Sequence, residues 1–422
     1  MIGTLNHNSK EVTIIGAGIS GLLTAYYLDR RGYRVTLLEQ KQRAGGLIKT
    51  SYSDYGMAES AAHSLIATPP VVELCKDLGV ELIEPKKESK AKYIVRDGKL
   101  RRFPLTVGEV ATTASRAAFV RSTNGNGQTL DEWGRKHLGN AAVEYLLTPF
   151  VRGIYGVQPE QLSVAAAYPS LSVPPGQTLL SSMMKKQKQR SRKKEAKKRV
   201  APRFGMGHLV SCLSSRLDAT LGPRFQTGHS VKVLPDAANL ILTTPAYAAA
   251  NLIEPESVEL AQSLRTVRYT PIVSVTVFVN RKDFTRAVEG VGALVPACEN
   301  RKCLGILFNS SSFADRVNDE SNVASFTVMM GGTTQIEWLD ADNEMIWSTV
   351  QSELLSLLGI REVLDLVIHR WPQALPQYSV DLPKVWQTAK ETWCATPGRM
   401  LFGNYTGQIS LRGMIESSAA LS

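Results

Sequence analysis

The feature that most constrains this chain is a glycine-rich turn set between two apolar strands near its N-terminus. Residues 11–15 form a short apolar strand and run directly into the sequence GAGISG at residues 16–21. Residues 22–31 then show the apolar spacing of a helix that stops at Gly32, and residues 34–39 predict a second strand. Strand, glycine turn, helix and strand in this order form a β-α-β unit, which is typical of an α/β fold.

The glycines of the turn fit the phosphates of a dinucleotide. Gly16 can take the positive φ of a tight turn, Gly18 lets the backbone approach a pyrophosphate, and Gly21 lets the helix pack on the strand. The first amides of the helix face the phosphate with the positive end of the helix dipole. Glu39 ends the second strand, where its carboxylate can accept a hydrogen bond from a ribose 2′-OH and disfavours a 2′-phosphate. The complete unit favours a dinucleotide site over a turn without a ligand, and its predicted residues are Gly16, Ala17, Gly18, Ile19, Ser20, Gly21 and Glu39.

The segment after Glu39 separates two dinucleotides, FAD and NAD. It reads QKQRAGGLI over residues 40–48, and the spacing acid-x₃-Arg-x-Gly-Gly resembles an extension found in FAD-dependent flavoproteins of the amine-oxidase type. Arg43 can meet phosphate charge, while the backbone of Gly45 and Gly46 can lie against the cofactor. FAD is therefore the predicted cofactor, and the predicted site gains Gln40, Arg43, Gly45, Gly46 and Leu47.

The basic charge of the chain is concentrated in one segment. The net charge is +11, and the segment KKQKQRSRKKEAKKR at residues 185–199 holds ten basic residues against Glu195 alone. A nucleic-acid-binding protein usually spreads its basic residues over a folded face or a groove-reading element. No such pattern is visible in the sequence, so we expect no nucleic acid as a partner.

Cysteine spacing and hydropathy bear on the compartment. The five cysteines form no CxxC pair, and their odd number does not indicate a disulfide framework, so a reducing compartment is expected. No basic segment followed by an apolar stretch opens the chain, and no apolar run reaches about 18 residues. We expect a cytoplasmic protein that is neither exported by a cleaved signal nor membrane-spanning, and attachment to a membrane surface stays open.

The rest of the chain reads as mixed α and β structure. Its 422 residues predict two or three domains at about 150 residues each. Residues 71–147 read as a weakly polar helical stretch, and a helix with good periodicity is expected over residues 340–358. Strand-like segments lie at residues 240–243, 272–280, 304–308 and 324–330.

Several sequence blocks carry a resemblance to one family. Residues 148–163, TPFVRGIYGVQPEQLS, are similar to the signature PFVxGxYxGxPEQLS of the oxygen-dependent protoporphyrinogen oxidases. Further matches follow in family order, namely GALVP at 292–296, LGILF at 304–308, RWPQALPQY at 370–378 and GNY at 403–405. The matches run from about residue 11 to residue 418 and cover nearly the whole chain. The blocks at residues 148–163 and 370–378 are specific to this family, whereas many unrelated oxidoreductases share the dinucleotide fingerprint.

The resemblance implies a mixed α/β (α+β) fold with a Rossmann-like FAD-binding domain of the p-hydroxybenzoate hydroxylase type. Two further domains are implied, one that binds substrate on a mixed sheet and one that is helical and associates with membranes. The implied ranges are 1–75, 205–260 and 385–422 for the discontinuous FAD domain, 76–89 and 261–384 for the substrate domain, and 90–200 for the helical domain.

The resemblance also implies an enzyme of haem biosynthesis that oxidises protoporphyrinogen IX to protoporphyrin IX. The macrocycle loses six electrons in three steps, each a hydride transfer to the flavin with loss of a proton, and oxygen or another acceptor reoxidises the flavin. The protein supplies position, a dry apolar slot and charge pairing for the propionates. The implied partners are the porphyrinogen, the electron acceptor, an anionic cytoplasmic membrane surface that holds the protein peripherally, and a second copy of the chain or a ferrochelatase.

Matching positions imply which residues hold the macrocycle. Leu294 and Leu307 match two apolar residues that sandwich the tetrapyrrole, and Met329 matches an aromatic residue of the family. The Gly153 carbonyl matches an acceptor for pyrrole N–H groups, and Lys92 matches a basic residue that pairs a propionate. Without the resemblance, the apolar residues would be read as strand core and Lys92 as a surface lysine. The resemblance adds Val231, Trp371, Gly403, Asn404 and Ile409 to the cofactor site, and we assign no catalytic residue and no metal ligand.

The chain departs from the family pattern in four places. ESAAHS at residues 59–64 replaces the stretch E-x-G-P/A-N-x near the flavin, which could turn His63 toward the pocket, although a lone histidine is more often a structural hydrogen-bonder. A hairpin usual in the family is missing between Val231 and Thr244. Gln408 stands where a glycine commonly approaches the flavin, and Val380-Asp381 replaces Gly-His.

Three other functions stay open at this point. Coproporphyrinogen III differs from protoporphyrinogen IX at only two peripheral substituents, and its four propionates would favour more basic residues around the pocket. An amine oxidase or a carotenoid desaturase would share the FAD fingerprint without requiring the two specific blocks. A non-enzymatic interaction protein with a basic tail could retain a flavin fold, but it would not be bleached by a porphyrinogen.

Overall fold

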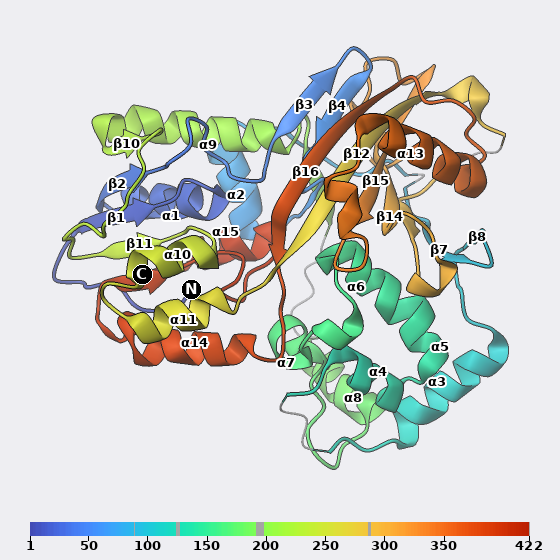
Figure 1. Cartoon of the computed structure of the whole chain (residues 1–422), viewed down its shortest axis with the longest axis horizontal. Coiled ribbons are helices and arrows are strands. Elements are labelled where there is room, and N and C mark those ends of the chain that lie inside the picture. Colours follow the sequence, from blue (N-terminus) through green and yellow to red (C-terminus); the bar gives the residue numbers. More distant parts are fainter. Residues whose placement is uncertain (88, 124–126, 191–197, 286–287, 422) are drawn as a thin grey trace.

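The chain folds into two sheets and a group of helices that surround a central cavity. The computed structural model describes residues 1–87, 89–123, 127–190, 198–285 and 288–421. Figure 1 shows a layered sheet with both termini on the left, a larger sheet on the upper right and the helical group below it. Residues 191–197 of the basic segment at residues 185–199 fall outside the described residues.

The first sheet carries the β-α-β unit that the sequence predicts. All of its strands are parallel, in the order β10-β2-β1-β11-β17. The strands are β1 (Glu11–Ile15), β2 (Arg34–Leu38), β10 (Phe225–Gln226), β11 (Leu240–Leu242) and β17 (Arg399–Leu401). Parallel strands place their carboxyl ends on one edge, so the loops after β1, β2 and β11 meet there.

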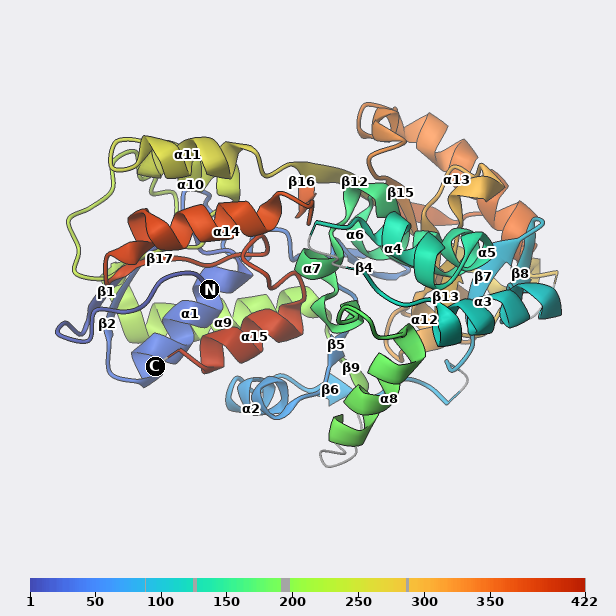
Figure 2. The same cartoon turned by 90° about the horizontal axis from the view of Figure 1, so that it is seen from below.

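Helices cover both faces of this parallel sheet (Figure 2). Val12 and Ile14 pack on one helical layer, while Ile15, Leu240 and Leu242 pack on the other. The first layer holds α1 (Ile19–Arg30), α2 (Pro69–Asp77), α9 (Met206–Leu221) and α15 (Leu411–Ala419), and the second holds α10 (Ala246–Ile253), α11 (Val258–Arg265) and α14 (Leu382–Glu391). Burial on both faces explains why these strands are almost wholly apolar.

The second sheet has seven strands in the order β16-β12-β15-β14-β13-β7-β8. Its neighbours are antiparallel except for the parallel pair β13 and β7. The strands are β7 (Lys92–Arg96), β8 (Lys99–Arg101), β12 (Tyr269–Asn280), β13 (Gly292–Leu294), β14 (Gly305–Phe308), β15 (Val323–Gly331) and β16 (Asp365–Pro376). Helix α13 (Asn343–Leu358) covers one face through Ile346, Val350 and Leu354, and the other face turns toward the cavity.

The helical group begins with two well-capped helices. Thr106 and Thr129 each form a capping box with a glutamate three residues later, which satisfies free N–H groups at both helix starts. The group consists of α3 (Val107–Phe119), α4 (Leu130–His137), α5 (Asn140–Ala142), a π-helical turn (Val143–Leu147), α6 (Thr148–Tyr155), α7 (Val164–Ala167) and α8 (Leu179–Arg190).

Short elements connect these three parts. The strands among them are β3 (Thr50–Ser53), β4 (Gly56–Glu59), β5 (Leu65–Ile66), β6 (Leu82–Ile83) and β9 (Arg199–Pro202). One short helix, α12 (Asn309–Ser312), follows β14. Turns of 3₁₀ helix lie at Pro159–Gln161, Pro169–Leu171, Gly222–Arg224, Arg281–Asp283, Ala297–Glu299, Ile336–Leu339 and Trp393–Ala395.

The structure confirms most elements that periodicity predicts and corrects one stretch. The four predicted strand segments after residue 240 are β11, β12, β14 and β15, and the helix expected over residues 340–358 is α13. The helical reading of residues 71–147 is wrong between α2 and α3, where β6, β7 and β8 lie. Residues 92–96 pair with β13, so this segment belongs to the seven-stranded sheet, and the helical group begins at Val107 instead of residue 90. The other domain boundaries stay predictions.

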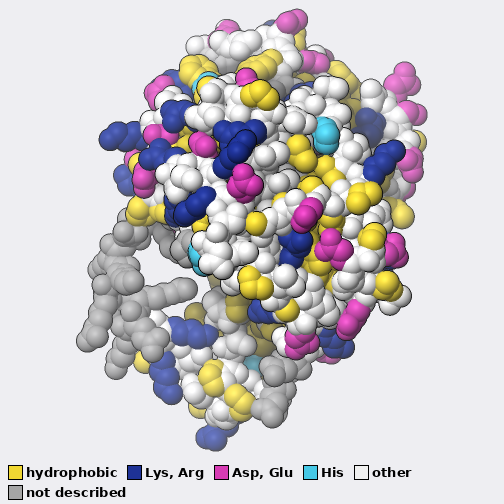
Figure 3. All heavy atoms as spheres, turned by 90° about the vertical axis from the view of Figure 1, so that its left-hand side faces the viewer, with side chains coloured by type: hydrophobic (Ala, Val, Ile, Leu, Met, Phe, Trp, Pro, Cys, Tyr) yellow, Lys and Arg dark blue, Asp and Glu magenta, His cyan; other side chains and the backbone are white. Residues whose placement is uncertain are grey.

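Three further features of the molecule are its cysteines, one charged face and its helix lengths. All five cysteines are free thiols. Lys and Arg side chains are interspersed with Asp and Glu on the face shown in Figure 3, so this face does not form a uniform basic surface. Within the described part of the chain, no helix is both long enough and apolar enough to cross a membrane.

Candidate functional site: a flavin and substrate cavity

A cavity of about 1130 Å³ lies where the two sheets and the helical group meet. At one end it is lined by the carboxyl edge of the parallel sheet, including Gly16, Glu39 and Thr243. At the other end it is lined by the open face of the seven-stranded sheet and by α6. The cavity therefore has two chemically different ends, one rich in backbone amides and the other apolar.

The glycine turn forms the first end. Gly16 has φ +99°, and a Cβ on Gly21 would lie 1.9 Å from the Gly16 carbonyl oxygen, so both positions require glycine. A Cβ on Gly18 would meet nothing within 4 Å, which leaves the backbone open to the cavity. Helix α1 begins at Ile19 without a side-chain cap, so its first N–H groups are free for a phosphate.

Glu39 and the loop after it close the same end. The Glu39 carboxylate lines the cavity and accepts hydrogen bonds from the backbone N–H of Ala17 (2.7 Å) and of Lys41 (2.9 Å). The Gly45 N–H donates to the Ala17 carbonyl at 2.7 Å, which places the second glycine pair against the first. A Cβ on Gly46 would lie 3.3 Å from the Gly18 Cα, so little room remains between the two turns.

Arg43 differs from the prediction that it meets phosphate charge. Its guanidinium donates to the carbonyls of Ile48 (3.0 Å) and Gly46 (2.7 Å), and it does not line the cavity. The local carbonyls lie within its reach, so the side chain fixes the shape of the glycine loop from behind. Two other predicted cofactor residues, Ala17 and Gly21, do not line the cavity either. They shape the glycine turn.

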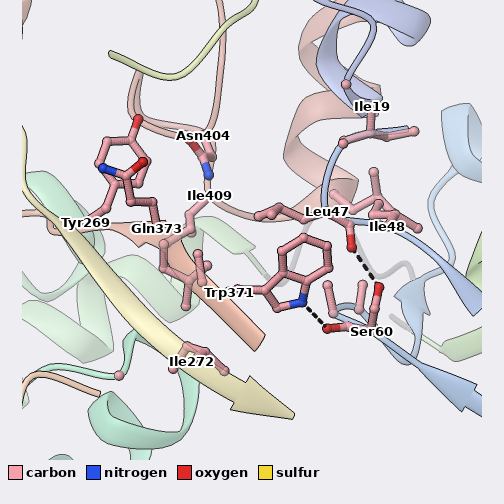
Figure 4. A pocket seen from close by; sticks show the side chains of 18 of the residues that line it. Ile19, Leu47, Ile48, Ser60, Tyr269, Ile272, Trp371, Gln373, Asn404 and Ile409 are labelled. Carbon is pink, nitrogen blue, oxygen red and sulfur yellow. Dashed lines mark hydrogen bonds between the residues drawn. The ribbon is translucent and has the colours of Figure 1, made fainter. Parts of the chain in front are cut away.

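The middle of the cavity is shown in Figure 4. The Trp371 indole N–H donates to the Ser60 carbonyl at 2.9 Å, and the Ser60 hydroxyl donates to the Leu47 carbonyl at 2.7 Å (Figure 4). These bonds link β16 of one sheet to the loops beside the other. Asn404 and Ile409 face the space from the loop after β17.

The apolar end is built by strand register. Leu294, Gly305 and Met329 are direct cross-strand neighbours on β13, β14 and β15, so they share one face. Leu307 lies two residues along β14 and therefore on the same face. These three apolar side chains are half-buried, whereas the next residues, such as Met330, are fully buried against α13. Because Gly305 has no side chain, the cavity has a slot between Leu294 and Met329, which both line it.

Helix α6 and three cationic residues complete this end, one of them the buried Arg152 of α6. A Cβ on Gly153 would lie 2.5 Å from the Leu294 Cδ2, so the helix backbone sits directly on the slot. Gly153 lies in the last turn of α6, where carbonyl groups lack intrahelical partners. Lys92 and Arg102 also line this end, and both are exposed.

His63 and Glu59 have perturbed acidities beside the cavity. Burial lowers the pKa of His63 to about 4, and its Nε2 is buried without a hydrogen-bond partner among the described residues. Burial raises the pKa of Glu59 to about 7, although the Met206 N–H and the Thr50 hydroxyl donate to its carboxylate. His63 is therefore neutral at pH 7 and lines the cavity, as the changed ESAAHS stretch allows.

The chemistry of the first end fits a flavin dinucleotide. Free amides at the start of α1, the open backbone at Gly18 and the carboxylate of Glu39 match a pyrophosphate and a ribose. The model of the family described as flavin containing amine oxidoreductase matches residues 19–418. The chain belongs to this family of flavin-containing amine oxidoreductases. It is an FAD-dependent oxidoreductase, as the glycine extension after Glu39 predicts.

Relatives within the family carry porphyrinogen oxidase names. The chain is 26% identical to protoporphyrinogen oxidase 2, chloroplastic/mitochondrial, of Arabidopsis thaliana over 97% of this chain and 92% of that protein. It is 26% identical to the mitochondrial protoporphyrinogen oxidase of Nicotiana tabacum over 98% and 94%. It is 22% identical to a coproporphyrinogen III oxidase of Staphylococcus aureus over 88% and 89%. These similarities support the resemblance carried by the sequence blocks.

Solved structures share the fold of this flavin-containing oxidoreductase. A protein of Exiguobacterium sp. 255-15, assigned provisionally as a protoporphyrinogen oxidase, superposes with a TM-score of 0.78 at 21% identity, over 98% of both chains. A reduced UDP-galactopyranose mutase superposes with a TM-score of 0.73 at 13% identity, over 97% of this chain and 92% of the other. At these identities the two structures are evidence for the fold alone.

The cavity brings together most residues that the sequence assigned to it. The cofactor candidates that line it are Gly16, Gly18, Ile19, Ser20, Glu39, Gln40, Gly45, Gly46, Leu47, Val231, Trp371, Gly403, Asn404 and Ile409. All five substrate candidates line it as well: Lys92, Gly153, Leu294, Leu307 and Met329. Which group each residue contacts stays a prediction.

Several lining residues were missed by the sequence reading. Thr243, Thr244 and Pro245 follow β11, and the rule that ligands bind at the carboxyl ends of parallel strands could have found them. Gln373 and Arg102 join the cavity only through sheet pairing and loop placement. No local pattern marks such residues.

Proposed function

We propose that this flavoprotein oxidises protoporphyrinogen IX to protoporphyrin IX with FAD, and that oxygen reoxidises the flavin. The observation that carries the proposal is the apolar wall of Leu294, Leu307 and Met329 beside α6, which lines the same cavity as the glycine turn. Such a wall, without a side chain at Gly305, suits a bulky apolar macrocycle. The names of relatives that match nearly the whole chain support the same substrate.

The residues of this chain bind and orient the macrocycle in the proposed reaction. FAD, when bound, supplies the acceptor for a hydride from a macrocycle carbon. Leu294, Leu307 and Met329 exclude water from the slot and hold the ring against the cavity wall. The Gly153 carbonyl accepts a hydrogen bond from a pyrrole N–H, which orients the ring, and Lys92 pairs a propionate at the exposed end.

A porphyrin fluorescence assay tests the proposal. The purified protein is incubated with protoporphyrinogen IX or coproporphyrinogen III, with oxygen and without it. We expect protoporphyrin to form aerobically, and the flavin absorbance to bleach anaerobically. If neither porphyrinogen yields product or bleaches the flavin, the proposal is wrong.

The same assay separates a second candidate substrate. A relative named coproporphyrinogen III oxidase matches 88% of this chain, so coproporphyrinogen III is the main competitor. Its four propionates would require more cationic contacts than two propionates do, and the cationic residues lining the main cavity are Lys41, Lys92, Arg102, Arg152 and Lys232. A strong preference for coproporphyrinogen III in the paired assay would move the assignment to that substrate.

We also propose that the helical group attaches to an anionic membrane surface. Val107 and Phe119 of α3 are 88% and 80% exposed, and Met183 and Met184 of the adjacent α8 are exposed next to Lys185. Exposed apolar side chains beside cationic ones fit a lipid interface, where each basic residue contributes about 1 kcal/mol. The central part of the basic segment lies outside the described residues.

Vesicle sedimentation tests the attachment. The protein should co-sediment with anionic vesicles, fail to co-sediment with neutral ones and dissociate in high salt. Deletion of residues 185–199 should remove most binding and leave flavin content intact. Retained binding in the deletion variant, together with loss in Val107→Glu/Phe119→Glu, would assign attachment to the apolar helices. A second copy of the chain and a ferrochelatase stay predictions as partners.

A further inference from the structure

A second, smaller cavity of about 210 Å³ adjoins the apolar end of the main cavity. His63, Val291 and Leu307 line both cavities, so the two spaces are separated only by a thin wall. Along β14, Leu307 faces the main cavity, and Asn309, two residues farther on, lines the smaller one. We call this smaller space the side cavity.

Two arginines face the side cavity from different segments. Arg316, in the loop before β15, is 5% exposed, and Arg199, at the start of β9, is half-buried. Both guanidinium groups lie near the ring of Phe313, at 5.7 Å and 5.0 Å from its centroid. The shared aromatic ring therefore holds two positive charges at one wall of the side cavity.

These two charges have few partners. Arg316 donates from Nη1 to the Met57 sulfur (2.8 Å) and from Nη2 to the Pro202 carbonyl (2.9 Å), while its buried Nε has no partner. Neither arginine forms an ion pair with a carboxylate within the residues that the structure describes. A buried guanidinium without a counter-ion is unfavourable, so this wall is set up for an anion.

The one carboxylate among the residues lining the side cavity does not supply that anion. Glu59 already accepts hydrogen bonds from the Met206 N–H (2.7 Å) and the Thr50 hydroxyl (2.8 Å). It forms no ion pair with either arginine within the described residues, although the charge of Arg316 partly offsets the effect of burial on the Glu59 pKa. Its raised pKa still leaves it partly protonated near neutral pH. The other titratable lining residue is His63, which is neutral at pH 7 because burial lowers its pKa.

We propose that the side cavity binds a carboxylate through Arg316 and Arg199, and that this carboxylate is one propionate arm of the porphyrinogen held against Leu307. The proposal rests on the proposed function, since it places a substituent of the porphyrinogen ring past Leu307, which lines both the main cavity and the side cavity. Arginine suits the role because its fork of donors matches a carboxylate. Two protein segments that are far apart in sequence would then recognise the same substituent.

The side cavity and Lys92 would act as two separate anchors. Gly292 pairs with Lys92 on one side and with Leu307 on the other. Lys92 and Leu307 are therefore two strand spacings apart, which is roughly 10 Å. Lys92 is reached from Leu307 by crossing the sheet, whereas the side cavity is reached from Leu307 by following the chain to Asn309. A ring held at two such points has one orientation relative to the flavin end, so the anchors would select which edge of the macrocycle reacts.

Substitution of Arg199 tests the proposal with the whole protein. Arg199→Gln keeps the backbone pairing of Arg199 with Ile66 and removes a side chain that makes no hydrogen bond to the described residues, so folding should persist. Protoporphyrinogen IX and its dimethyl ester serve as paired substrates. We expect the KM for the diacid to rise about tenfold, with kcat within about twofold and the KM for the ester unchanged. Arg199→Lys should restore part of the difference.

Matched controls make the outcome decisive. Arg203→Gln removes a nearby arginine that is ion-paired with Glu81 and Asp315, and it should leave both KM values unchanged. Equal changes for diacid and ester in Arg199→Gln, or no change for either, would overturn the assignment to a propionate arm. Flavin absorbance and Tm confirm that each variant is folded and loaded.

Added sodium propionate distinguishes a free anion from the substrate arm. If propionate raises the Tm of the parent but not of Arg199→Gln, while the KM for the diacid is equal in both, the site binds free carboxylates and the substrate assignment is wrong. If the parent oxidises neither porphyrinogen, the proposed function has failed, and the same Tm comparison still decides whether the side cavity binds a carboxylate. Absence of any propionate effect in that case would overturn the site itself.

Discussion

The two ends of the main cavity are built in opposite ways. The flavin end takes its central residues from one continuous stretch, residues 16–47, supported by the loops after β11 and β17. The apolar end, which would hold the proposed substrate and is therefore termed the substrate end, is built from four segments. They contribute Lys92, Gly153, Leu294 and Met329 and meet only through sheet pairing and the packing of α6. The first end is specified by a local backbone conformation, and the second by register.

This difference predicts how each end responds to substitution. The flavin end depends on glycines whose neighbours leave no room, such as Gly21, so a single added side chain disrupts it. The substrate end depends on side chains of ordinary strands, so a substitution there changes fit without removing the sheet. Damage to the two ends should therefore appear in different measurements, namely flavin content and KM.

The largest expected effect is loss of the flavin on substitution of Gly21. In Gly21→Val, the Cβ would lie 1.9 Å from the Gly16 carbonyl oxygen and 2.7 Å from the Thr243 hydroxyl, so the turn and the start of α1 must move. We expect purified Gly21→Val to contain essentially no flavin by absorbance at 450 nm, a typical flavin band. Gly108→Ala is the matched control, because a Cβ there meets nothing within 4 Å. Normal flavin content in Gly21→Val would contradict this account of the flavin end.

The next effect concerns the polar group of the flavin end. Glu39→Ala removes a carboxylate that lines the cavity and accepts two backbone hydrogen bonds. FAD affinity should fall by roughly 1.5–3 kcal/mol, the cost of losing hydrogen bonds to a charged group. Fluorescence titration of the apoprotein with FAD measures it, and unchanged affinity at limiting FAD would count against the placement of Glu39.

A paired substitution on β15 tests the substrate end. Met329→Ala enlarges the slot, so the KM for protoporphyrinogen IX should rise about tenfold while flavin content stays normal. Met330→Ala, one residue on, faces α13 in the buried core and should lower Tm without changing the KM. The same KM change in both variants would argue against the assignment of the two sheet faces.

The smallest expected effect is a pH dependence of stability at Glu59. Burial raises the pKa of Glu59 from its usual value near 4.5 to about 7, so between these values the unfolded chain releases a proton that the folded chain retains. This contribution favours the folded state at low pH and is lost as pH rises through the window. Glu59→Gln should therefore gain about 2 kcal/mol on the parent between pH 5 and pH 8, or about 2–3 °C in Tm for a chain of this length. A Tm difference that is constant across this range would show that Glu59 has an ordinary pKa.

The sequence by itself determined the flavin end, because the required conformations are local. Gly16, Gly18 and Gly21 must occupy a strand–turn–helix junction in which Gly16 takes a positive φ and a Cβ on Gly21 would clash with the Gly16 carbonyl oxygen. Glu39 follows at a fixed distance in the same unit. The FAD extension at Gly45 and Gly46 follows for the same reason. Arg43 marks the limit of this local specification, because its reach to a phosphate or to local carbonyls depends on a loop shape that spacing does not fix.

Only the tertiary structure decided the geometry of the substrate end and of the side cavity. Family blocks indicated Leu294, Leu307 and Met329, but their common face follows from cross-strand register, which a chain acquires only when distant strands pair. The segment at residues 92–96 was read as helical because its strand is completed by β13, about 200 residues later. Nothing in the sequence links Arg199, the last residue of the basic segment, to Arg316, since their charges converge only when β9 and the loop before β15 pack on Phe313. Long-range packing, which carries no local signal, placed these charges together.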